Sequence, residues 1–265
     1  MDSMLIRSLE EMAKRRHARI GIGIWNADDE LIDCLKPAAD YADLVLVGNS
    51  RSDCDLDCIA TDEPWNELVK LLDEGQIDGA VRGNLPAGRT MRALSQHFGI
   101  IVKRLALIEL SGWAFFLGPV GIDEGDFIQD RLNLALDGAK YLKAMGISPK
   151  VSILSGGRME DLGRSEKIDR SLAEGEFIAA RARDLGLAAE HRGILIENCK
   201  GDDLIIAPDG ISGNLIFRTL LLLCGANALG APVLMDKIFV DSSRARGNFN
   251  GPVMLASAMA GIKRY

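Results

Sequence analysis

The chain has 265 residues, of which 48% are apolar and 26% are charged, and its formal net charge at pH 7 is −7. This length and composition predict a globular protein of one or two domains with a large core. The excess of acidic residues argues against nucleic acid or an anionic membrane surface as a partner, because a phosphate backbone requires a basic face.

The longest apolar run, Leu215 to Leu223, is interrupted by Arg218 and Thr219. It is well short of the roughly 20 apolar residues that cross a bilayer, so no transmembrane segment is predicted. Residues 1–20 mix charged and apolar side chains at helical spacing, which predicts an amphipathic first helix instead of a signal sequence. These features favour a cytoplasmic protein.

The cysteines and histidines give no sign of a metal or disulfide framework. The odd, scattered set of cysteines predicts reduced thiols; it comprises Cys34, Cys54, Cys58, Cys199 and Cys224. Only one pair has a metal-like spacing, and no second Cys or His pair lies near it, so no metal site is predicted. Each histidine stands without a Ser or Cys partner in a recognisable motif and is expected at the surface; these are His17, His97 and His191.

Short apolar runs alternate with segments of helical period, which predicts an α/β fold with parallel sheets buried by helices. The strands are expected within residues 19–25, 42–48, 78–83, 103–110, 151–157, 193–198, 203–210 and 237–243. Residues 63–75 and 128–146 carry apolar stripes that predict core-facing helices, which end at Gly75 and Gly146.

No internal repeat or flexible linker divides the chain. If there are two domains, the best crossing points lie after the fourth strand and before the last, so that the chain leaves the first domain and returns to it. The first domain would comprise residues 1–110 and 233–265, and the second residues 111–232.

Ligands of open α/β sheets collect at the carboxyl ends of the strands, so the residues that follow each strand are the candidate site. Four such positions combine glycine, hydroxyl, amide and guanidinium groups. They comprise Arg82 and Asn84; Ser155, Gly156, Gly157, Arg158 and the nearby Arg164; Asp209, Ser212, Gly213 and Asn214; and Ser243 with Arg244.

The segment 208–214, "PDGISGN", lies where one apolar run ends and the next begins. Ser212 or Asn214 can cap the helix that starts there, while Gly210 and Gly213 allow the backbone to approach a ligand. The amides of a helix start suit a phosphate or carboxylate. A capped turn with no ligand remains an alternative.

Arginines near the glycine turn at 155–158 suggest a second anion contact. Arg158 and Arg164 can clamp a phosphate, or they can pair within the loop with Glu160 and Asp161. At the end of the last strand, the segment 241–244, "DSSR", can orient an oxyanion and stabilise its charge. The early run "IGIGIW" lacks the Gly-x-Gly-x-x-Gly turn, so no nicotinamide cofactor is predicted.

Several stretches resemble known families. The C-terminal third, with "APDGISGN" followed by a helix and then Ser-Arg at a strand end, resembles the phosphate acetyl- and butyryltransferases, as does "DGAVRGN". The set "GGRMEDLGRS", "APDGISGNLIFRTL" and "VDSSR" is similar to the archaeal methanogenesis marker protein 4 (MtxX) group, which is described as methyltransferase-related.

The resemblance implies two α/β domains like those of phosphotransacetylase and isocitrate dehydrogenase, with the candidate residues around one cleft and a homodimer formed through the second domain. It also implies that Ser243 and Arg244 contact the phosphate or carbonyl group of a substrate. The acetyltransferases place an aspartate base seven residues after that serine, where this chain has Asn250. An amide cannot take a proton from a thiol.

Two functions follow as hypotheses. The first is a transferase-like enzyme that binds an anionic or phosphorylated metabolite and moves an acyl, phosphoryl or one-carbon group. The second is a non-catalytic sensor or assembly partner of methanogenesis enzymes, which Asn250 favours. A methyltransferase is implied only by the resemblance, since the chain lacks both a glycine turn for S-adenosylmethionine and a corrinoid-binding Asp-x-His-x-x-Gly. No cofactor is assigned.

Overall fold

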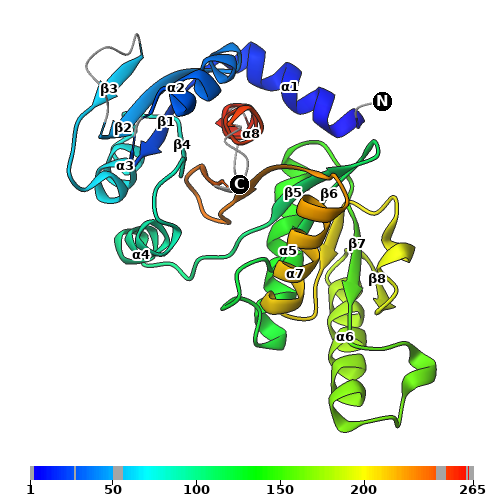
Figure 1. Cartoon of the computed structure of the whole chain (residues 1–265). Coiled ribbons are helices and arrows are strands. Elements are labelled where there is room, and N and C mark those ends of the chain that lie inside the picture. Colours follow the sequence, from blue (N-terminus) through cyan, green and yellow to red (C-terminus); the bar gives the residue numbers. More distant parts are fainter. Residues whose placement is uncertain (1–2, 27, 50–55, 243–248, 261, 263–265) are drawn as a thin grey trace. The chain divides into compact units, whose positions relative to one another are not determined.

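The structure is a computed structural model, and it describes residues 3–26, 28–49, 56–242, 249–260 and 262 (Figure 1). The chain forms two compact units, which we call the central unit (Lys103–Asn227) and the N-terminal unit (Asp2–Val102 with Ala228–Tyr265). The chain therefore passes between units at 102/103 and 227/228, whereas the sequence placed the domain boundaries at 110/111 and 232/233.

The N-terminal unit contains a sheet in the order β3-β2-β1-β4-β11-β10. Its strands are β1 Ala18–Ile24, β2 Ala42–Gly48, β3 Asp57–Ile59, β4 Gly79–Val81, β10 Asn227–Pro232 and β11 Phe239–Asp241. All neighbours pair in parallel except β10 and β11, which are antiparallel. The carboxyl ends of β1 to β4 and of β11 therefore share one edge of the sheet.

Several helices of this unit begin at residues that favour a helix start. They are α1 Met4–Arg16, α2 Asp29–Leu35, α3 Pro64–Asp73, α4 Ala87–Phe98 and α8 Asn250–Ala260, with the 3-10 helix η1 at Lys36–Asp40. Ser3 caps α1, and Asp28 caps α2 by accepting from the main-chain N–H of Leu31. Proline occupies the first position of α3, where its missing N–H has no cost.

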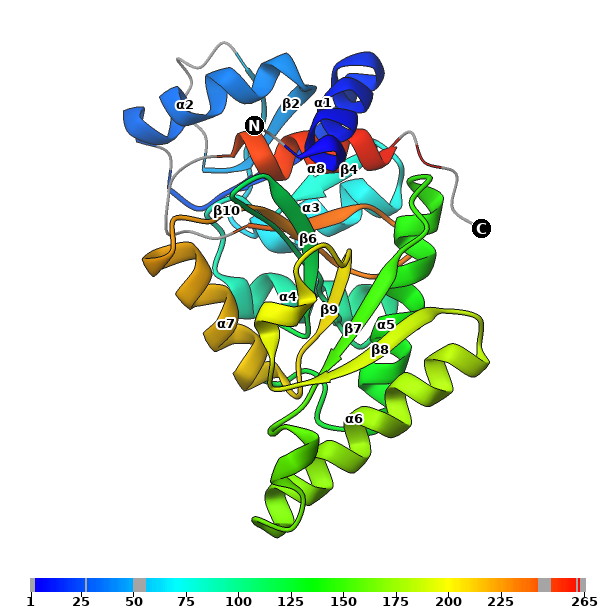
Figure 2. The same ribbon diagram turned by 90° about the vertical axis from the view of Figure 1, so that its right-hand side faces the viewer.

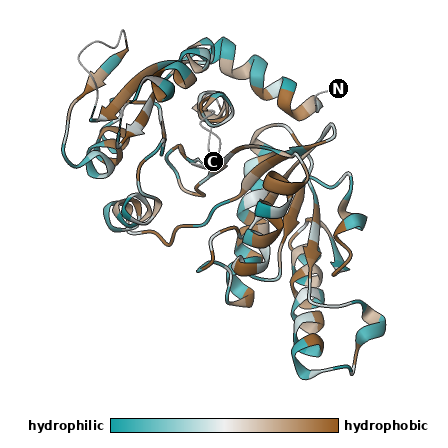
Figure 3. Cartoon of the chain, in the orientation of Figure 1, coloured by the Kyte–Doolittle hydropathy of each residue, from teal (hydrophilic) through white to brown (hydrophobic). Residues whose placement is uncertain are grey.

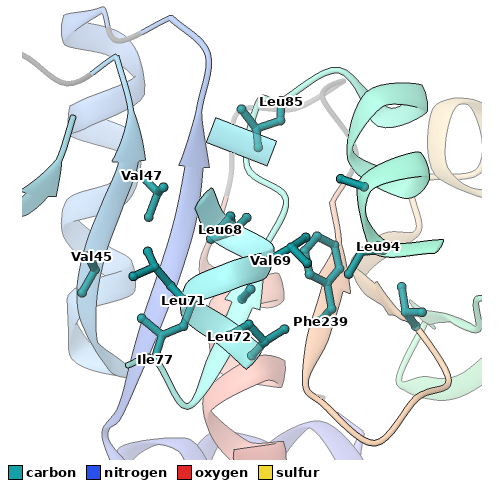
Figure 4. Close-up of a cluster of buried hydrophobic side chains, with 13 residues drawn as sticks. Val45, Val47, Leu68, Val69, Leu71, Leu72, Ile77, Leu85, Leu94 and Phe239 are labelled. Carbon is teal, nitrogen blue, oxygen red and sulfur yellow. The ribbon is translucent and has the colours of Figure 1, made fainter. Parts of the chain in front are cut away.

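A cluster of buried apolar side chains lies between α3, α4 and the strands of this unit (Figure 4). Leu68, Leu72, Leu94 and Phe239 belong to it, and each is almost completely buried. Helix α8 is buried from Pro252 to Met259. A helix that is apolar on all sides must be enclosed by protein, which explains the absence of a polar stripe in its sequence.

The central unit contains a sheet in the order β5-β6-β9-β7-β8. Its strands are β5 Ala106–Leu110, β6 Trp113–Gly118, β7 Lys150–Leu154, β8 Ala188–Gly193 and β9 Leu204–Ile206. Strands β6, β9, β7 and β8 pair in parallel, and β5 joins β6 in an antiparallel hairpin. The turn of that hairpin, Ser111-Gly112, has φ values of 52° and 81°, which suit a tight two-residue turn.

Three helices cover this sheet: α5 Ile128–Ala144, α6 Glu166–Asp184 and α7 Gly210–Leu223. Helices α5 and α6 pack against each other, and α7 lies on the opposite face from α5 (Figure 2). The short 3-10 helices η2 Met159–Asp161 and η3 Ile196–Cys199 complete the unit. Apolar residues concentrate on the strands and on the inward sides of the helices (Figure 3).

The α/β class and the helices expected at 63–75 and 128–146 are confirmed. The strand expected at 193–198 is wrong. Strand β8 ends at Gly193, the first residue of that range, and Gly193 with φ 61° turns the chain toward η3. Strand β8 reads "AAEHRG", and a polar strand at the edge of a sheet gives little apolar signal. Strands β3, β6 and β10 were also not predicted.

No helix in the described part of the chain is long and apolar enough to cross a membrane.

Candidate functional site

The carboxyl edge of the central sheet brings together three loops that the sequence separates widely. Because β9 pairs in parallel with both β6 and β7, the segments that follow these strands emerge side by side. These segments are 119–124, 155–158 and 208–214. Two of the three were predicted as candidate sites, and the segment 119–124 was not.

Asp209 is the residue that caps α7. Its Oδ1 accepts a hydrogen bond of 2.7 Å from the main-chain N–H of Ser212, and the helix begins at Gly210. The expectation that Ser212 or Asn214 caps this helix is therefore wrong, since both lie inside its first turns. The aspartate carboxylate occupies the N-cap position because it satisfies a main-chain donor and interacts favourably with the helix dipole.

The glycines of this segment make room for protein. A Cβ atom on Gly210 would overlap the carbonyl oxygen of Gly121, and one on Gly213 would overlap that of Pro119. The Nδ2 of Asn214 donates a hydrogen bond of 2.8 Å to the carbonyl oxygen of Val120. The backbone of the first turn of α7 thus lies against the segment after β6. The sequence had suggested that these glycines let the backbone approach a ligand.

The residues Ser155 to Gly157 are held by several hydrogen bonds, one of them 2.8 Å long from the main-chain N–H of Ser155 to the carbonyl oxygen of Gly193. Ser155 is buried, and its Oγ lies 2.8 Å from Nε2 of His191. The main-chain N–H of Gly156 donates to Oγ of Ser171 at 2.8 Å, and the carbonyl oxygen of Gly157 accepts from Ile194 at 3.0 Å. These contacts fix the path of the turn that follows β7.

His191 is not a surface residue, which corrects the expectation for it. Its side chain is only 4% exposed and lies between Ser155 and Glu176, whose carboxylate oxygen Oε2 is 3.3 Å from Nδ1. A Cβ atom on Gly175 would come within 2.6 Å of Nε2, so a glycine in the middle of α6 makes space for the ring. The local sequence around His191 gave no signal of this contact.

The arginines near this turn pair within their own loop. Asp161 accepts from the main-chain N–H of Arg158 at 2.9 Å and from Nη1 of Arg164 at 2.5 Å. The main-chain hydrogen bond from Arg158, and secondly the side chain of Arg164, lower the pKa of the Asp161 carboxyl. Of the two alternatives, pairing inside the loop is the one observed for Arg164. The side chain of Arg158 is exposed.

Two partly buried ion pairs at this edge were not predicted from the sequence. Nη2 of Arg131, on α5, donates to Oε2 of Glu174 at 2.6 Å, and Nε of Arg104 donates to Oε1 of Glu124 at 2.7 Å. The Arg131 side chain is 4% exposed, and its Nε is buried without a hydrogen-bond partner among the described residues. A charged group inside an amphipathic helix gives no sequence signal that it points inward.

The candidate residues of the N-terminal unit hold strand ends together. Arg82 is buried, and its guanidinium pairs with Asp241 and donates to the carbonyl oxygen of Leu85 at 2.7 Å. Asn84 accepts from the main-chain N–H of Trp25 at 2.6 Å. Oγ of Ser242 donates to the carbonyl oxygen of Gly83 at 2.9 Å. Residues 82–84 and 241–242, which follow β4 and β11, are thereby linked.

Ser243 and Arg244, the proposed catalytic pair, lie outside the described residues. Asn250 is the first residue of α8, and its Oδ1 is buried. Among the side chains that the structure describes, no group of three or more His, Cys, Asp or Glu is placed to hold a metal ion.

We predict that Gly213→Ala destabilises the protein. Gly→Ala inside a helix is normally stabilising by about 0.5–1 kcal/mol, but here the new Cβ would overlap the Pro119 carbonyl oxygen. A cost of about 1–3 kcal/mol is expected from this overpacking, seen as a lower midpoint in thermal unfolding. Gly88→Ala in α4 is the matched control, because nothing lies within 4 Å of its Cβ position, and it should not lower the midpoint.

We also predict that Arg164→Ala raises the pKa of Asp161 without restoring its ordinary value. The larger cause of the lowered pKa, the main-chain donor of Arg158, remains in the variant. A lowered pKa means that the carboxylate contributes stability above its ordinary pKa and loses it as the pH falls through the lowered value. A carbon-detected NMR titration of Asp161 measures this shift. Arg170→Ala, which removes a cation paired with Glu174, should leave it unchanged.

Solved structures with the same fold include phosphotransacylases. The chain is similar to a branched-chain phosphotransacylase from Enterococcus faecalis, with a TM-score of 0.74, 15% identity and coverage of 93% of this chain and 100% of the other. A phosphotransacetylase from Streptococcus pyogenes gives a TM-score of 0.73 at 17% identity, covering 97% and 98%. At such identities the likeness establishes the fold.

No protein-family model matches the chain. Among curated proteins, it is 42% identical over 271 residues to methyltransferase mtx subunit X of Methanosarcina mazei, covering 98% of this chain and 96% of the relative. The protein of that name from Methanosarcina acetivorans is 44% identical over 266 residues, covering 97% and 95%. An "uncharacterized methyltransferase" of Methanopyrus kandleri is 36% identical over 255 residues, covering 92% and 99%.

The resemblance to the MtxX group drawn from the sequence motifs is confirmed by these relatives. Because identity at this level extends over nearly the whole of each chain, the protein belongs to the family of methyltransferase mtx subunit X.

Proposed function

We propose that the protein is a transferase-like protein that binds a phosphorylated or otherwise anionic small molecule at the carboxyl edge of the central sheet. The observation that carries this proposal is the buried guanidinium of Arg131, which has an ion pair on one side and an Nε–H without a described acceptor on the other. A buried donor without an acceptor is costly, and an anion oxygen would supply the missing partner.

The position of Arg131 supports an anion as that partner. It lies in the first turn of α5, where main-chain N–H groups and the helix dipole favour negative charge. Its side chain packs against Gly125 in the segment that follows β6. Glu174 accepts from only one N–H group of the guanidinium, at Nη2, and its own side chain is 26% exposed. A phosphate oxygen could accept from the Nε–H in a charge-assisted hydrogen bond.

The residues of the group-transfer step remain those that the family resemblance suggests. Arg244 would stabilise charge that develops on the oxygens of the transferred acyl or phosphoryl group, and Ser243 would donate a hydrogen bond to it. The solved structures of similar fold that are named phosphotransacylase and phosphotransacetylase support acyl or phosphoryl transfer over other reactions. The name of the sequence relatives supports a methyl group instead.

Asn250 favours a second candidate function, a non-catalytic sensor or assembly partner of methanogenesis enzymes. A carboxamide has no basic form at neutral pH, so it cannot activate a coenzyme A thiol. In this alternative the anion site is retained for binding while group transfer is lost.

Calorimetric titration with inorganic phosphate and acetyl phosphate tests the binding proposal. Arg131→Lys keeps the charge but removes the Nε–H donor, and we expect about tenfold weaker binding with an unchanged fold. Arg181→Lys on α6, an exposed arginine that pairs with Asp184, is the control and should bind as the parent does. Equal affinity of the two variants would refute the anion site at Arg131.

Isotope exchange between phosphate and acetyl phosphate in the presence of coenzyme A distinguishes a transferase from a non-catalytic sensor. It can be measured on the same protein preparation. Exchange that Arg244→Ala abolishes supports the enzyme. Binding without exchange supports the sensor.

We propose, in addition, that the chain forms a homodimer through α7 of the central unit. The side chains of Ile211, Leu215 and Leu222 recur at helical spacing on one side of α7, and Ile211 and Leu215 are 60% and 62% exposed. A large apolar stripe on a surface commonly marks a protein interface. An isologous pairing of two such helices would bury both stripes.

Leu215→Glu is expected to convert this dimer to a monomer, because a carboxylate would be buried without a partner in the interface. Light scattering coupled to gel filtration gives the mass directly. Leu185→Glu replaces an exposed apolar residue outside α7 and serves as the control that should remain dimeric. A parent protein that is monomeric at micromolar concentration contradicts the proposal.

A further inference from the structure

Three side chains that play no part in the proposed function come together in the N-terminal unit. Trp25 directly follows β1, Trp65 is the second residue of α3, and Arg89 is the third residue of α4. The two indole rings have centroids 5.4 Å apart and planes tilted by 35°. The guanidinium carbon Cζ of Arg89 lies 4.9 Å from the Trp65 ring and 5.8 Å from the Trp25 ring.

All three residues are supplied by segments that follow strands of the parallel sheet. Trp25 comes after β1, Trp65 belongs to the helix after β3, and Arg89 belongs to the helix after β4. This is the edge at which ligands of open α/β sheets bind. We call the group the tryptophan platform: Trp25, Trp65 and Arg89.

The main chain of Trp25 is held at both of its polar groups. Oδ1 of Asn84 accepts from its N–H at 2.6 Å, and Nδ2 of Asn49 donates to its carbonyl oxygen at 3.3 Å. Asn84 also donates to the carbonyl oxygen of Asn26 at 2.8 Å. Since the two asparagines follow β4 and β2, residues at the edge of the sheet hold the main chain from which this indole projects. Asn84 thus holds the main chain of Trp25, whereas the sequence suggested that it contacts a substrate.

The platform rests on the core and also reaches the surface. Trp25 and Trp65 pack against the buried cluster around Leu68 while remaining partly exposed. Arg89 is exposed, and within the described part of the chain no carboxylate pairs with it, although acidic residues outnumber basic ones by 38 to 31. The guanidinium is therefore attracted to the faces of the indoles and keeps its hydrogen-bond donors for another group.

We propose that the tryptophan platform binds a planar nitrogen heterocycle that carries an anionic group. The ring would stack on the indoles in the place that the guanidinium now covers, and Arg89 would turn to pair with the anion. Indole faces stack on heterocycles of this kind with little dependence on the ring, and arginine forms paired hydrogen bonds with phosphate and carboxylate. A nucleobase with phosphate and a pteridine with carboxylates share this chemistry.

The proposal does not depend on the anion site at Arg131, which belongs to the other unit. It requires both the ring and the charge, because indoles alone would accept any flat apolar molecule and an exposed arginine alone would accept any anion. The fixed main chain of Trp25 reduces the ordering cost on binding and is typical of a preorganised site.

Calorimetric titration of the full chain with two ring-containing probes and their fragments tests the inference. The probes are adenosine 5′-monophosphate and folate, and the fragments are adenosine, inorganic phosphate and glutamate. We expect one probe to bind at least about tenfold more tightly than its fragments. Trp65→Leu and Arg89→Ala should each weaken that binding by about tenfold, while Trp65→Phe, which keeps an aromatic face, should largely retain it.

Arg92→Ala is the matched control, since Arg92 is an exposed arginine on the same helix, one turn beyond Arg89. It should bind as the parent does. Equal losses in Arg89→Ala and Arg92→Ala would show that only net charge matters and would overturn the proposal. So would probes that bind no more tightly than their fragments. Should Trp65→Leu unfold, the comparison of Arg89→Ala with Arg92→Ala still decides the question, because both arginines are exposed on α4.

Discussion

The close contact between the first turn of α7 and the segment after β6 determines what the carboxyl edge of the central sheet can offer a ligand. Gly210 and Gly213 allow the backbones to approach, and Asn214 joins them with a hydrogen bond to Val120. Asp209 is occupied as the helix cap. Several polar groups of this segment are therefore satisfied by protein, whereas among the buried side-chain donors that the structure describes, Nε of Arg131 has no partner.

A comparable constraint operates in the N-terminal unit, where Arg82 and Asp241 form a buried ion pair between the ends of β4 and β11. Removing one partner of such a pair would leave an uncompensated buried charge, which is strongly destabilising. The ion pair and the hydrogen bond from Ser242 to Gly83 hold the end of β11, directly before Ser243 and Arg244 in the sequence. In this structure Arg82 holds the ends of β4 and β11 together, whereas the sequence suggested that it binds a substrate.

The sequence predicted those parts of the fold whose signals are local. Pro64 at a helix start and the apolar runs of β1, β2, β7 and β9 could be identified because periodicity and caps lie within a few residues. Strand β8 could not, since its residues at the sheet edge are mostly polar and partly exposed. The turn at Gly193 was likewise missed, because the glycine stands directly before an apolar run and a positive φ leaves no mark in the sequence except the glycine itself.

In the candidate site, too, features with local sequence signals could be predicted and contacts between distant residues could not. Taking the residues after each strand identified loops that lie together within each unit, because parallel pairing places such loops at one edge of that unit's sheet. It assigned ligand contacts to groups whose partners are distant in sequence, such as Asn214, which contacts a residue 94 positions away. His191 and Ser155, 36 positions apart, could not be connected for the same reason. Hydrogen-bond satisfaction is a tertiary property, so residue type alone cannot separate a binding group from a structural one.

Arg131 and Arg89 differ in a way that bears on their proposed roles. Arg131 is buried and half neutralised by Glu174, so an anion there would be desolvated and bound through directed hydrogen bonds. Arg89 is exposed beside two indoles, so its charge is screened by water and its contribution depends on the ring that stacks with it. A buried donor selects for the geometry of an anion, whereas an exposed cation over aromatic rings selects for a flat ligand that brings its own charge. The two proposed sites therefore call for different ligand chemistry.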